Sequence, residues 1–265
     1  MVKEKPFLYS LFTIYDQVME VESKAIDRLS IRARPRGWPI MRQHWGKLLF
    51  MHWPISADLI RPLIPRRLTI DTFDGSAWIG VVPFTMWGVR PSFAPPVPGL
   101  SAFHELNVRT YVHLDGVPGV WFFSLDAESA LAVWAARAFF HLPYFNARMS
   151  LKQQGRTILY TSHRAHARAA PAEFEATWII KDALPASEPG SLPFFLTERY
   201  CLYAAHHDRL FRCRIFHPSW PLQEASISSS RSTMIESHGL PTPEGEPLLH
   251  YAEALGVDIW MLREV

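Results

Sequence analysis

The sequence predicts a mainly β fold of the α+β class, an antiparallel sheet rolled into a barrel or a sandwich, with a few helices at its edges. Ten Trp, 17 Phe and 22 Pro among 265 residues are typical of strands, turns and aromatic loops, and not of a helix bundle. Many short strand patterns follow one another between turn signals, and few stretches have helical periodicity. No internal repeat or low-complexity tract interrupts this order, and one domain with an N-terminal extension is the simplest division of the chain.

Composition and charge exclude several classes of function. Hydrophobic residues make up 48% and charged residues 20% of the chain, so a substantial core is expected. The formal net charge is only +2, and no run of Lys and Arg alternates with aromatics, which argues against a nucleic-acid partner. No run of about 18 apolar residues predicts a membrane span. Because no signal-peptide cleavage pattern is found, a cytoplasmic protein without a membrane partner is expected.

The sequence contains no pattern that predicts a metal or another cofactor. Two cysteines, Cys201 and Cys213, are too few for a zinc site and predict no disulfide scaffold. The closest histidine groups are His163 with His166, and His206 with His207 and Asp208. An H-x-x-H pattern on a strand points its histidines to opposite faces, and H-H-D fits a hairpin turn. No phosphate-binding loop, dinucleotide glycine motif or G-x-S-x-G elbow occurs.

The N-terminal segment has helical periodicity. Between residue 6 and about residue 31, apolar side chains recur at spacings of three and four, which predicts an amphipathic helix. They are Phe7, Leu11, Ile14, Val18, Val21 and Leu29. The basic segment R-A-R-P-R-G-W-P then predicts a linker. We therefore expect a helical extension with linker over 1–37 and one β-barrel domain over 38–265; the helix could pack on its own domain or on a partner subunit of a homo-oligomer.

Strand patterns begin at Trp45. The run G-K-L-L-F-M-H-W-P predicts a buried strand that ends at Pro54, and 56–65 predicts a short helix with Ser56 as its N-cap. The turn F-D-G-S joins predicted strands at 68–71 and 77–89. The segment 90–99 contains four prolines and is expected to be a loop at the rim of a pocket.

The rest of the chain predicts one helix and several further strands. A strand at 103–114 turns through D-G into a strand at 119–125. A helix at 126–140 is expected to face inward with Ala127, Leu131, Trp134 and Phe139, and Pro143 ends it. Further strands are expected at 144–153, 157–165, 174–181, 195–205, 209–216 and 248–262, and Ser228–Ser230 are expected in a loop.

The strand at 103–114 carries the strongest candidate site. Glu105, Asn107, Arg109 and Tyr111 alternate with apolar residues, so they share one face at steps of about 7 Å. If that face looks into the barrel, Glu105 could act as acid or base with a raised pKa, and Arg109 could bind a carboxylate. The alternative is a Glu–Arg pair on the solvent face of an edge strand.

Four more polar residues are candidates for the same pocket. Arg137 could bind a ligand carboxylate or phosphate, or could form an ion pair with Glu105 or Asp126. Tyr144 could donate a proton or a hydrogen bond to a ligand, or could only fill space. Arg199, in T-E-R-Y, could close the far wall of the cavity or form a cross-strand ion pair. Asn146 completes the set.

A series of motifs resembles the bacterial YqjF-like family (DUF2071). The motifs are H-W-P-I-S-A-D-L-I-R-P-L-I-P-R-R-L, W-I-G-V-V-P-F, F-H-E-L-N-V-R-T-Y-V, G-V-W-F-F-S-L-D-A, A-A-R-A-F-F-H-L-P-Y, F-L-T-E-R-Y-C-L-Y and H-P-S-W-P-L. They occur in this order between about Trp38 and the C-terminus. The resemblance implies the acetoacetate decarboxylase-like fold, an antiparallel barrel or cone around a ligand-sized cavity, and it implies no known reaction.

The resemblance to acetoacetate decarboxylase extends to part of its pocket. That enzyme carries G-R-E-x-x-G-Y-P-K-K, whose first lysine forms a Schiff base while the second lowers its pKa. Arg137 and Pro143 fall in register with this pattern, but Tyr144 and Phe145 occupy the lysine positions, and no lysine lies between Lys47 and Lys152. The resemblance also equates Glu105 with the glutamate of that pocket. It therefore implies a cavity without Schiff-base chemistry.

Two functions from different classes follow. The first is a non-catalytic binder of a small carbonyl or carboxylate compound. The second is a lyase or hydrolase-like enzyme that uses Glu105 as acid or base without an imine intermediate. An apolar, aromatic-rich cavity suits either function, so the expected partner is a small molecule.

Overall fold

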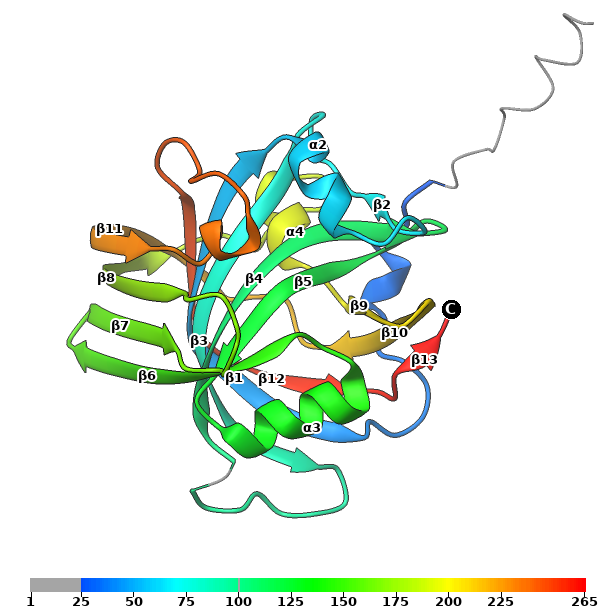
Figure 1. Ribbon diagram of the computed structural model, residues 1–265, viewed down its shortest axis with the longest axis horizontal. Coiled ribbons are helices and arrows are strands. Elements are labelled where there is room, and N and C mark those ends of the chain that lie inside the picture. The colour runs from blue at the N-terminus through cyan, green and yellow to red at the C-terminus, as the bar shows by residue number, and fades with distance from the viewer. Residues whose placement is uncertain (1–24, 100) are drawn as a thin grey trace, which may run out of the picture.

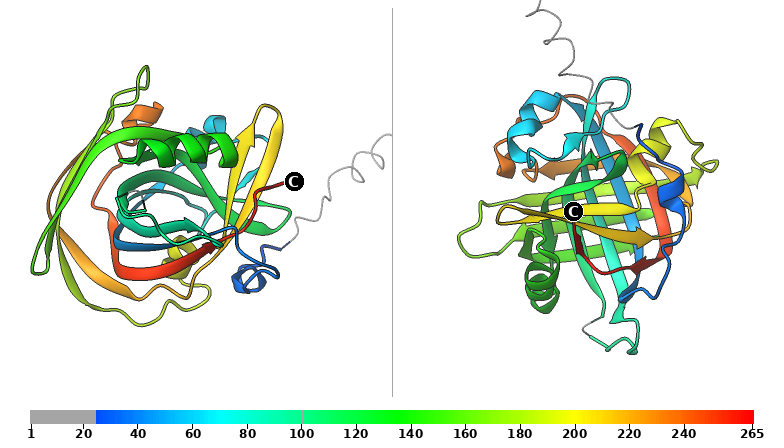
Figure 2. Two further views of the ribbon diagram at one scale, coloured as in Figure 1. Left: turned by 90° about the horizontal axis from the view of Figure 1, so that it is seen from below. Right: turned by 90° about the vertical axis from the view of Figure 1, so that its right-hand side faces the viewer.

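The computed structural model describes residues 25–99 and 101–265 (Figure 1). The fold is mostly β, as predicted. All strands within these residues belong to one sheet, in the order β13-β10-β9-β5-β6-β7-β8-β11-β12-β1-β3-β4-β2. Additional pairings join β4 to β5 and β10 to β12. Figure 2 shows that this sheet is strongly curved.

The strands differ widely in length, and three of the longest lie next to one another. They are β1 (Met41–Ile55), β2 (Thr69–Ile70), β3 (Ala77–Pro91), β4 (Phe103–Leu114), β5 (Val117–Ala127), β6 (Tyr144–Gln154), β7 (Thr157–Arg164), β8 (Glu173–Ala183), β9 (Cys201–His206), β10 (Arg209–Phe216), β11 (Leu222–Ser232), β12 (Leu248–Ile259) and β13 (Arg263–Glu264). Most neighbours are antiparallel. The exceptions are β5 with β6 and β5 with β9, which pair in parallel, so the prediction of a purely antiparallel sheet is wrong there.

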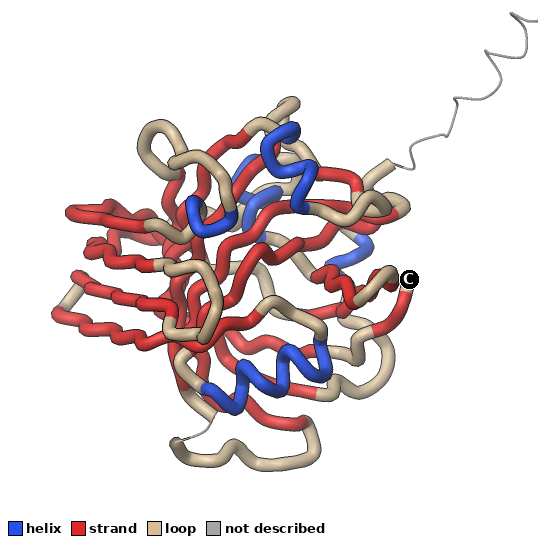
Figure 3. Tube along the Cα trace, viewed as in Figure 1, coloured by secondary structure: helices blue, strands red, loops and turns tan. Residues whose placement is uncertain are grey.

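The helical segments are few and short beside the strands (Figure 3). They are α2 (Ala57–Ile60), α3 (Ala130–Phe140) and α4 (Leu192–Thr197), with 3-10 turns η1 (Ser30–Arg32), η2 (Arg61–Leu63) and η3 (Glu236–His238). Ser56 caps α2 by accepting a hydrogen bond from the Asp58 amide, as predicted. None of the helices in the described residues is long and apolar enough to cross a membrane.

The position of β1 between two apolar clusters explains why the middle of this strand is continuously apolar. Leu48 and Phe50 face one apolar cluster, and Leu49 and Met51 face another, because successive side chains of a strand point to opposite faces. A strand buried on both faces needs no polar residue in its middle. The cluster around Leu48 and Phe50 surrounds the cavity described below.

The turn between β4 and β5 also follows from its sequence. Asp115 and Gly116 both have positive φ, 50° and 77°. A two-residue hairpin of this type requires left-handed conformations at both positions, which Asp tolerates and Gly adopts freely. The turn thus fixes the register of the strand that carries Glu105.

The predicted inward face of the long helix is wrong. Strand β5 continues to Ala127, and Ser129 caps α3 by accepting from the Ala132 amide. Leu131, Trp134 and Phe139 are 55%, 60% and 62% exposed. The residues that face inward from α3 are Ala132, Val133, Ala135, Ala136 and Phe140. Small alanines let the helix approach the sheet closely, so side-chain size was a misleading guide to its buried face.

Two other local predictions are corrected. Of the predicted strand 195–205, residues 195–197 belong to α4, whose N-cap Ser191 accepts from the Phe194 amide, and only 201–205 are strand. Ser228–Ser230, expected in a loop, lie within β11 and pair with β8. The serine-rich sequence lacks alternating apolar residues, and pairing with β8 overrides that weak local preference.

The predicted N-terminal helix lies mostly outside the described residues. Within them, residues 25–29 are not helical, and Ser30–Arg32 form the single 3-10 turn η1. The segment from residue 25 to residue 37, here called the N-terminal arm, is therefore not the end of a continuous helix.

Candidate functional site

A cavity of about 210 Å³ lies among β1, β3, β4, α3 and the strands β9 and β10. Its walls are mostly apolar and aromatic. Its polar lining residues are Gln43, Glu105, Asn107, Arg109, Tyr144, Thr197, Arg199 and His217. Since pockets for drug-sized ligands measure about 300–1,000 Å³, this cavity suits a smaller ligand.

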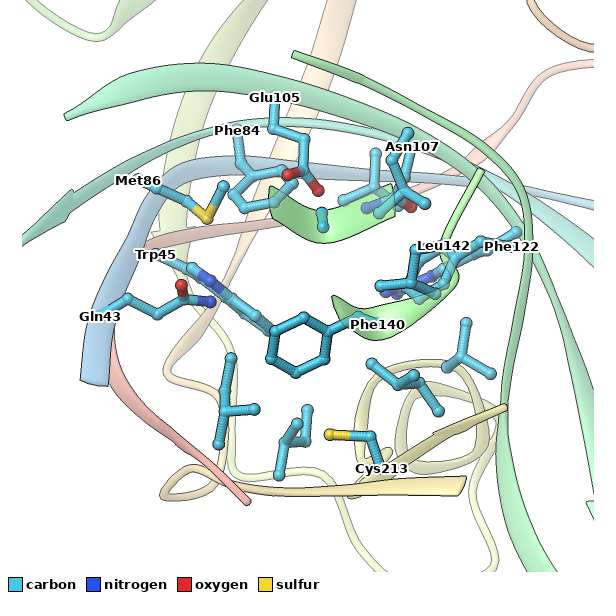
Figure 4. Close-up of a pocket in the computed structure, with 18 of the residues that line it drawn as sticks. Gln43, Trp45, Phe84, Met86, Glu105, Asn107, Phe122, Phe140, Leu142 and Cys213 are labelled. Atoms are coloured by element: carbon cyan, nitrogen blue, oxygen red, sulfur yellow. The ribbon is translucent and has the colours of Figure 1, made fainter. Parts of the chain in front are cut away.

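The predicted polar face of β4 points into this cavity. Glu105, Asn107 and Arg109 all line it, because they alternate along one strand. Figure 4 shows the Glu105 carboxyl group and Asn107 directed toward the space bounded by Trp45, Phe140 and other apolar side chains. The alternative of a Glu–Arg pair on a solvent face therefore does not apply.

Glu105 and Tyr144 form one end of the cavity. Glu105 is 2% exposed, and the Tyr144 hydroxyl donates to its Oε2 at 2.6 Å. Burial raises the pKa of Glu105 to about 8, although hydrogen bonds from Tyr144 and Asn107 act in the opposite direction. Glu105 is therefore mostly protonated at neutral pH. A protonated carboxyl group can donate a hydrogen bond as well as accept one.

Arg199 lines another part of the cavity wall, and two hydrogen bonds fix its guanidinium group. Its Nε donates to the Phe195 carbonyl and its Nη1 to Asp71 Oδ2, both at 2.7 Å. Its Nη2 is buried and has no partner among the described residues. Because a buried donor without an acceptor costs free energy, this nitrogen marks a place where an anion could bind.

Asp71 binds a second arginine. Arg28 donates to both of its carboxylate oxygens at 2.6 Å. Burial alone would raise the pKa of Asp71, but Arg28 and Arg199 hold it below its ordinary value. Asp71 is thus a carboxylate between two guanidinium groups, and the three side chains together carry one net positive charge.

Arg109 adds a second guanidinium to the lining. Its Cζ lies 5.2 Å from the ring centroid of Phe50 and 5.9 Å from that of Tyr111. No carboxylate of the described residues lies within 4.0 Å of its nitrogens. Arg109 lies four positions after Glu105 along β4, about 13 Å of strand. Neither Arg109 nor Arg199 is among the groups that shift the pKa of Glu105, so the cavity has an acidic end and a basic end.

Two of the predicted site residues lie outside this cavity. Arg137 is exposed on α3, and its Nη1 donates to the Tyr144 carbonyl at 2.7 Å. It faces away because Ala136 and Phe140 occupy the cavity side of the helix. Asn146 lies two residues beyond Tyr144 on β6 and does not line the cavity, and its backbone N–H donates to His166 Nδ1 at 3.2 Å. Among the described residues, no hydrogen bond joins either side chain to Glu105.

Several lining residues were not predicted from the sequence. Gln43 and Trp45 come from β1, while His217 and Trp220 come from the loop after β10. His217 is buried, stacks on Tyr200 at 4.4 Å, and has a carbonyl oxygen within 3.2 Å of each ring nitrogen. The motif H-P-S-W-P-L contains the last two residues, and its paired prolines were the available signal.

Comparison with known proteins decides the family. The DUF2071 family model, described as an uncharacterized conserved protein, matches residues 42–256. The chain belongs to the DUF2071 family. This DUF2071 protein is also 44% identical over 230 residues to the uncharacterized protein YqjF of Bacillus subtilis (strain 168), which covers 87% of this chain and 94% of YqjF.

Solved structures similar to this DUF2071 protein share its fold. One is the enduracididine biosynthesis enzyme MppR complexed with pyruvate, with a TM-score of 0.61 and 12% identity over 86% of this chain and 91% of MppR. Another is an acetoacetate decarboxylase, with a TM-score of 0.58 and 16% identity over 87% of this chain and 90% of that one. The predicted family and its acetoacetate decarboxylase-like fold are thus confirmed.

The described residues supply neither a lysine in the cavity lining nor a cluster of metal-binding side chains. The lining formed by residues 25–99 and 101–265 contains no lysine. Within the same residues, no group of three or more His, Cys, Asp or Glu side chains is arranged to hold a metal ion. Tyr144, at the position that the resemblance equates with a lysine, directs its hydroxyl to Glu105.

Proposed function

We propose that this DUF2071 protein binds a small carboxylate compound that also carries a carbonyl group. The observation that carries the proposal is that Arg199 lines the cavity and that its buried Nη2 has no hydrogen-bond partner among the described residues. A ligand carboxylate would accept from this nitrogen and from Arg109. Charge-assisted bonds of this kind are among the strongest in proteins.

The charge of the cavity supports an anionic ligand. At neutral pH Glu105 is mostly protonated, so it does not cancel the positive charge of Arg109. Asp71 is shared between Arg28 and Arg199, so a positive charge remains there too. An anion entering from water would exchange its hydration for two guanidinium groups.

The other end of the ligand would meet Glu105. Tyr144 uses its proton for Glu105 Oε2, which leaves the proton of the neutral carboxyl group free for the ligand. A carbonyl oxygen is a suitable acceptor. Asn107 lies between the two ends on β4, and its cross-strand neighbours Val82 and Leu125 are apolar and suit a short hydrocarbon linker.

The surroundings of the cavity fit a preformed binding site. The additional pairings of β4 with β5 and of β10 with β12 support a sheet that closes into a barrel around the ligand.

The two buried cysteines, both free, fit a protein of the reducing cytoplasm.

Calorimetric titration with matched ligands tests the proposal. Short oxo- and hydroxycarboxylates should bind, and their uncharged primary amides should bind about 10- to 100-fold more weakly, the worth of a charge-assisted bond. Arg109→Met should weaken carboxylate binding by a similar factor without leaving a carboxylate of the described residues unpaired. Arg148→Met, at an exposed site on β6, is the control. Equal affinity for carboxylates and amides would contradict the proposal.

The second candidate function is catalysis by Glu105. The pKa of about 8 in a cavity favours it, because a group that titrates near neutral pH can both give and take a proton. If the protein is an enzyme, the carboxylates that bind should be converted by the wild type and only bound by Glu105→Gln, as followed by NMR.

Borohydride reduction in the presence of a bound oxo acid separates this mechanism from imine chemistry. We expect the mass of the protein to stay unchanged, because no described lysine lines the cavity. A lysine found covalently labelled would refute the mechanism without an imine, while leaving carboxylate binding intact.

A further inference from the structure

We propose that Arg28 of the N-terminal arm is a positioning residue for the ligand in the cavity. It acts through Asp71 on Arg199, and so sets the charge and orientation of the basic end. The inference rests on the proposed function, and it adds to that function a segment outside residues 42–256, the part of the chain that the family model matches.

The arm is fixed along the outside of the domain. The Asp27 amide donates to the Gly116 carbonyl at 3.0 Å, and Arg214 Nη2 donates to the Ile31 carbonyl at 2.8 Å. Arg32 donates to the Ser219 hydroxyl at 2.7 Å. Figure 1 shows the arm as the blue segment near β10. These contacts join the arm to the β4–β5 turn, to β10 and to the loop that carries Trp220.

Arg28 reaches from this arm to the buried Asp71. Its two terminal nitrogens bind both carboxylate oxygens, which is the bidentate geometry that arginine favours. Arg199 Nη1 shares Oδ2 with Arg28 Nη1. The Cζ atoms of both arginines lie over the Phe195 ring, at 5.0 Å and 4.3 Å from its centroid. The order from outside to inside is therefore Arg28, Asp71, Arg199, cavity.

Arg28 determines the net charge of the group formed by Arg28, Asp71 and Arg199, and so affects the binding of an anion. With Arg28 present, two guanidinium groups face one carboxylate, and a positive charge remains for a ligand. Without Arg28, Asp71 and Arg199 form a neutral pair, and Asp71 can draw both terminal nitrogens of Arg199 toward itself. The partnerless Nη2 of Arg199 would then turn away from the ligand.

The effect of removing Arg28 should depend on ligand charge. Arg28→Met should weaken binding of a short oxocarboxylate about 10-fold, the worth of one partly screened charge interaction. Binding of the matching primary amide should change less than about 2-fold, because the amide does not use the net charge. Arg28→Lys should lie between wild type and Arg28→Met, because it keeps the charge and loses the bidentate geometry.

Arg34→Met is the matched control. Arg34 is an arginine of the same arm, but its partners are Asp258 and the rings of Phe216 and Trp260, away from Asp71. It should leave carboxylate affinity unchanged. Each variant is the full chain, and circular dichroism checks its folding.

The outcomes are distinguishable. Equal carboxylate affinity in Arg28→Met and wild type would overturn the inference, as would an equal loss for carboxylate and amide, which indicates a merely structural role. If Arg34→Met has the same effect as Arg28→Met, the arm acts as a whole and the role of Arg28 is refuted. If the wild type binds carboxylates no better than amides, the proposed function fails, and this inference fails with it.

Discussion

Glu105→Gln should make the protein more stable than the wild type at pH 8, and this advantage should shrink to near zero by pH 4.5. The folded wild type holds the Glu105 proton up to a pKa of about 8, compared with an ordinary value of 4.5. Above pH 4.5 the unfolded chain releases this proton and gains free energy that the folded chain does not. The stability of the wild type therefore falls as pH rises from 4.5 to 8.

The size of the effect follows from the same two values. Each pH unit between them costs the wild type up to about 1.4 kcal/mol, and the whole interval up to about 5 kcal/mol. Gln keeps an oxygen that can accept from the Tyr144 hydroxyl and has no proton to release on unfolding, so Glu105→Gln does not lose stability over this interval.

Urea unfolding of both proteins at pH 5, 6.5 and 8 measures this difference. The control is Glu188→Gln, at an exposed position, which should leave the pH profile of the wild type unchanged. Parallel profiles for the wild type and Glu105→Gln would show that the Glu105 carboxyl group titrates as it does in water, and would remove the acid–base argument for the cavity.

Arg164→Met should destabilise the fold by about 3–5 kcal/mol, the usual result of leaving one charge of a buried pair without its partner. Arg164 donates to both oxygens of Asp126 at 2.8 and 2.7 Å, and their side chains are 3% and 0% exposed. Arg164 is on β7 and Asp126 on β5, with β6 between them in the sheet. The Arg164–Asp126 ion pair therefore bridges β6, the strand that carries Tyr144.

The exposed pair Arg156–Asp182 supplies the matched control, since its side chains are 67% and 91% exposed. Arg156→Met should change the free energy of unfolding by less than about 1 kcal/mol. The double variant Arg164→Met with Asp126→Asn should recover part of the loss, because it removes the charge that the single variant leaves buried. Similar urea midpoints for Arg164→Met and Arg156→Met would show that water reaches Asp126 and screens it.

The local patterns of the chain account for most of its strands and for the polar face of the cavity. Alternation along β4 assigned Glu105, Asn107 and Arg109 to one face, because a strand has a strict period of two. The inward face of a helix is harder to predict from the sequence when that face consists of alanines. For that reason the predicted inward face of α3 is wrong, and Arg137, one of the candidates for the cavity, lies outside it.

The sequence by itself determined the strand that carries the site and the absence of lysine between Lys47 and Lys152. Only the tertiary structure decided what surrounds that site. The Asp71–Arg199 contact spans 128 residues, and Arg28 joins it from outside the region matched by the family model. Glu105 acquires its pKa of about 8 mainly because distant segments exclude water from it. Alternation is a property of the local backbone, whereas desolvation and charge pairing depend on which remote residues fold around a group, and no local pattern contains that information.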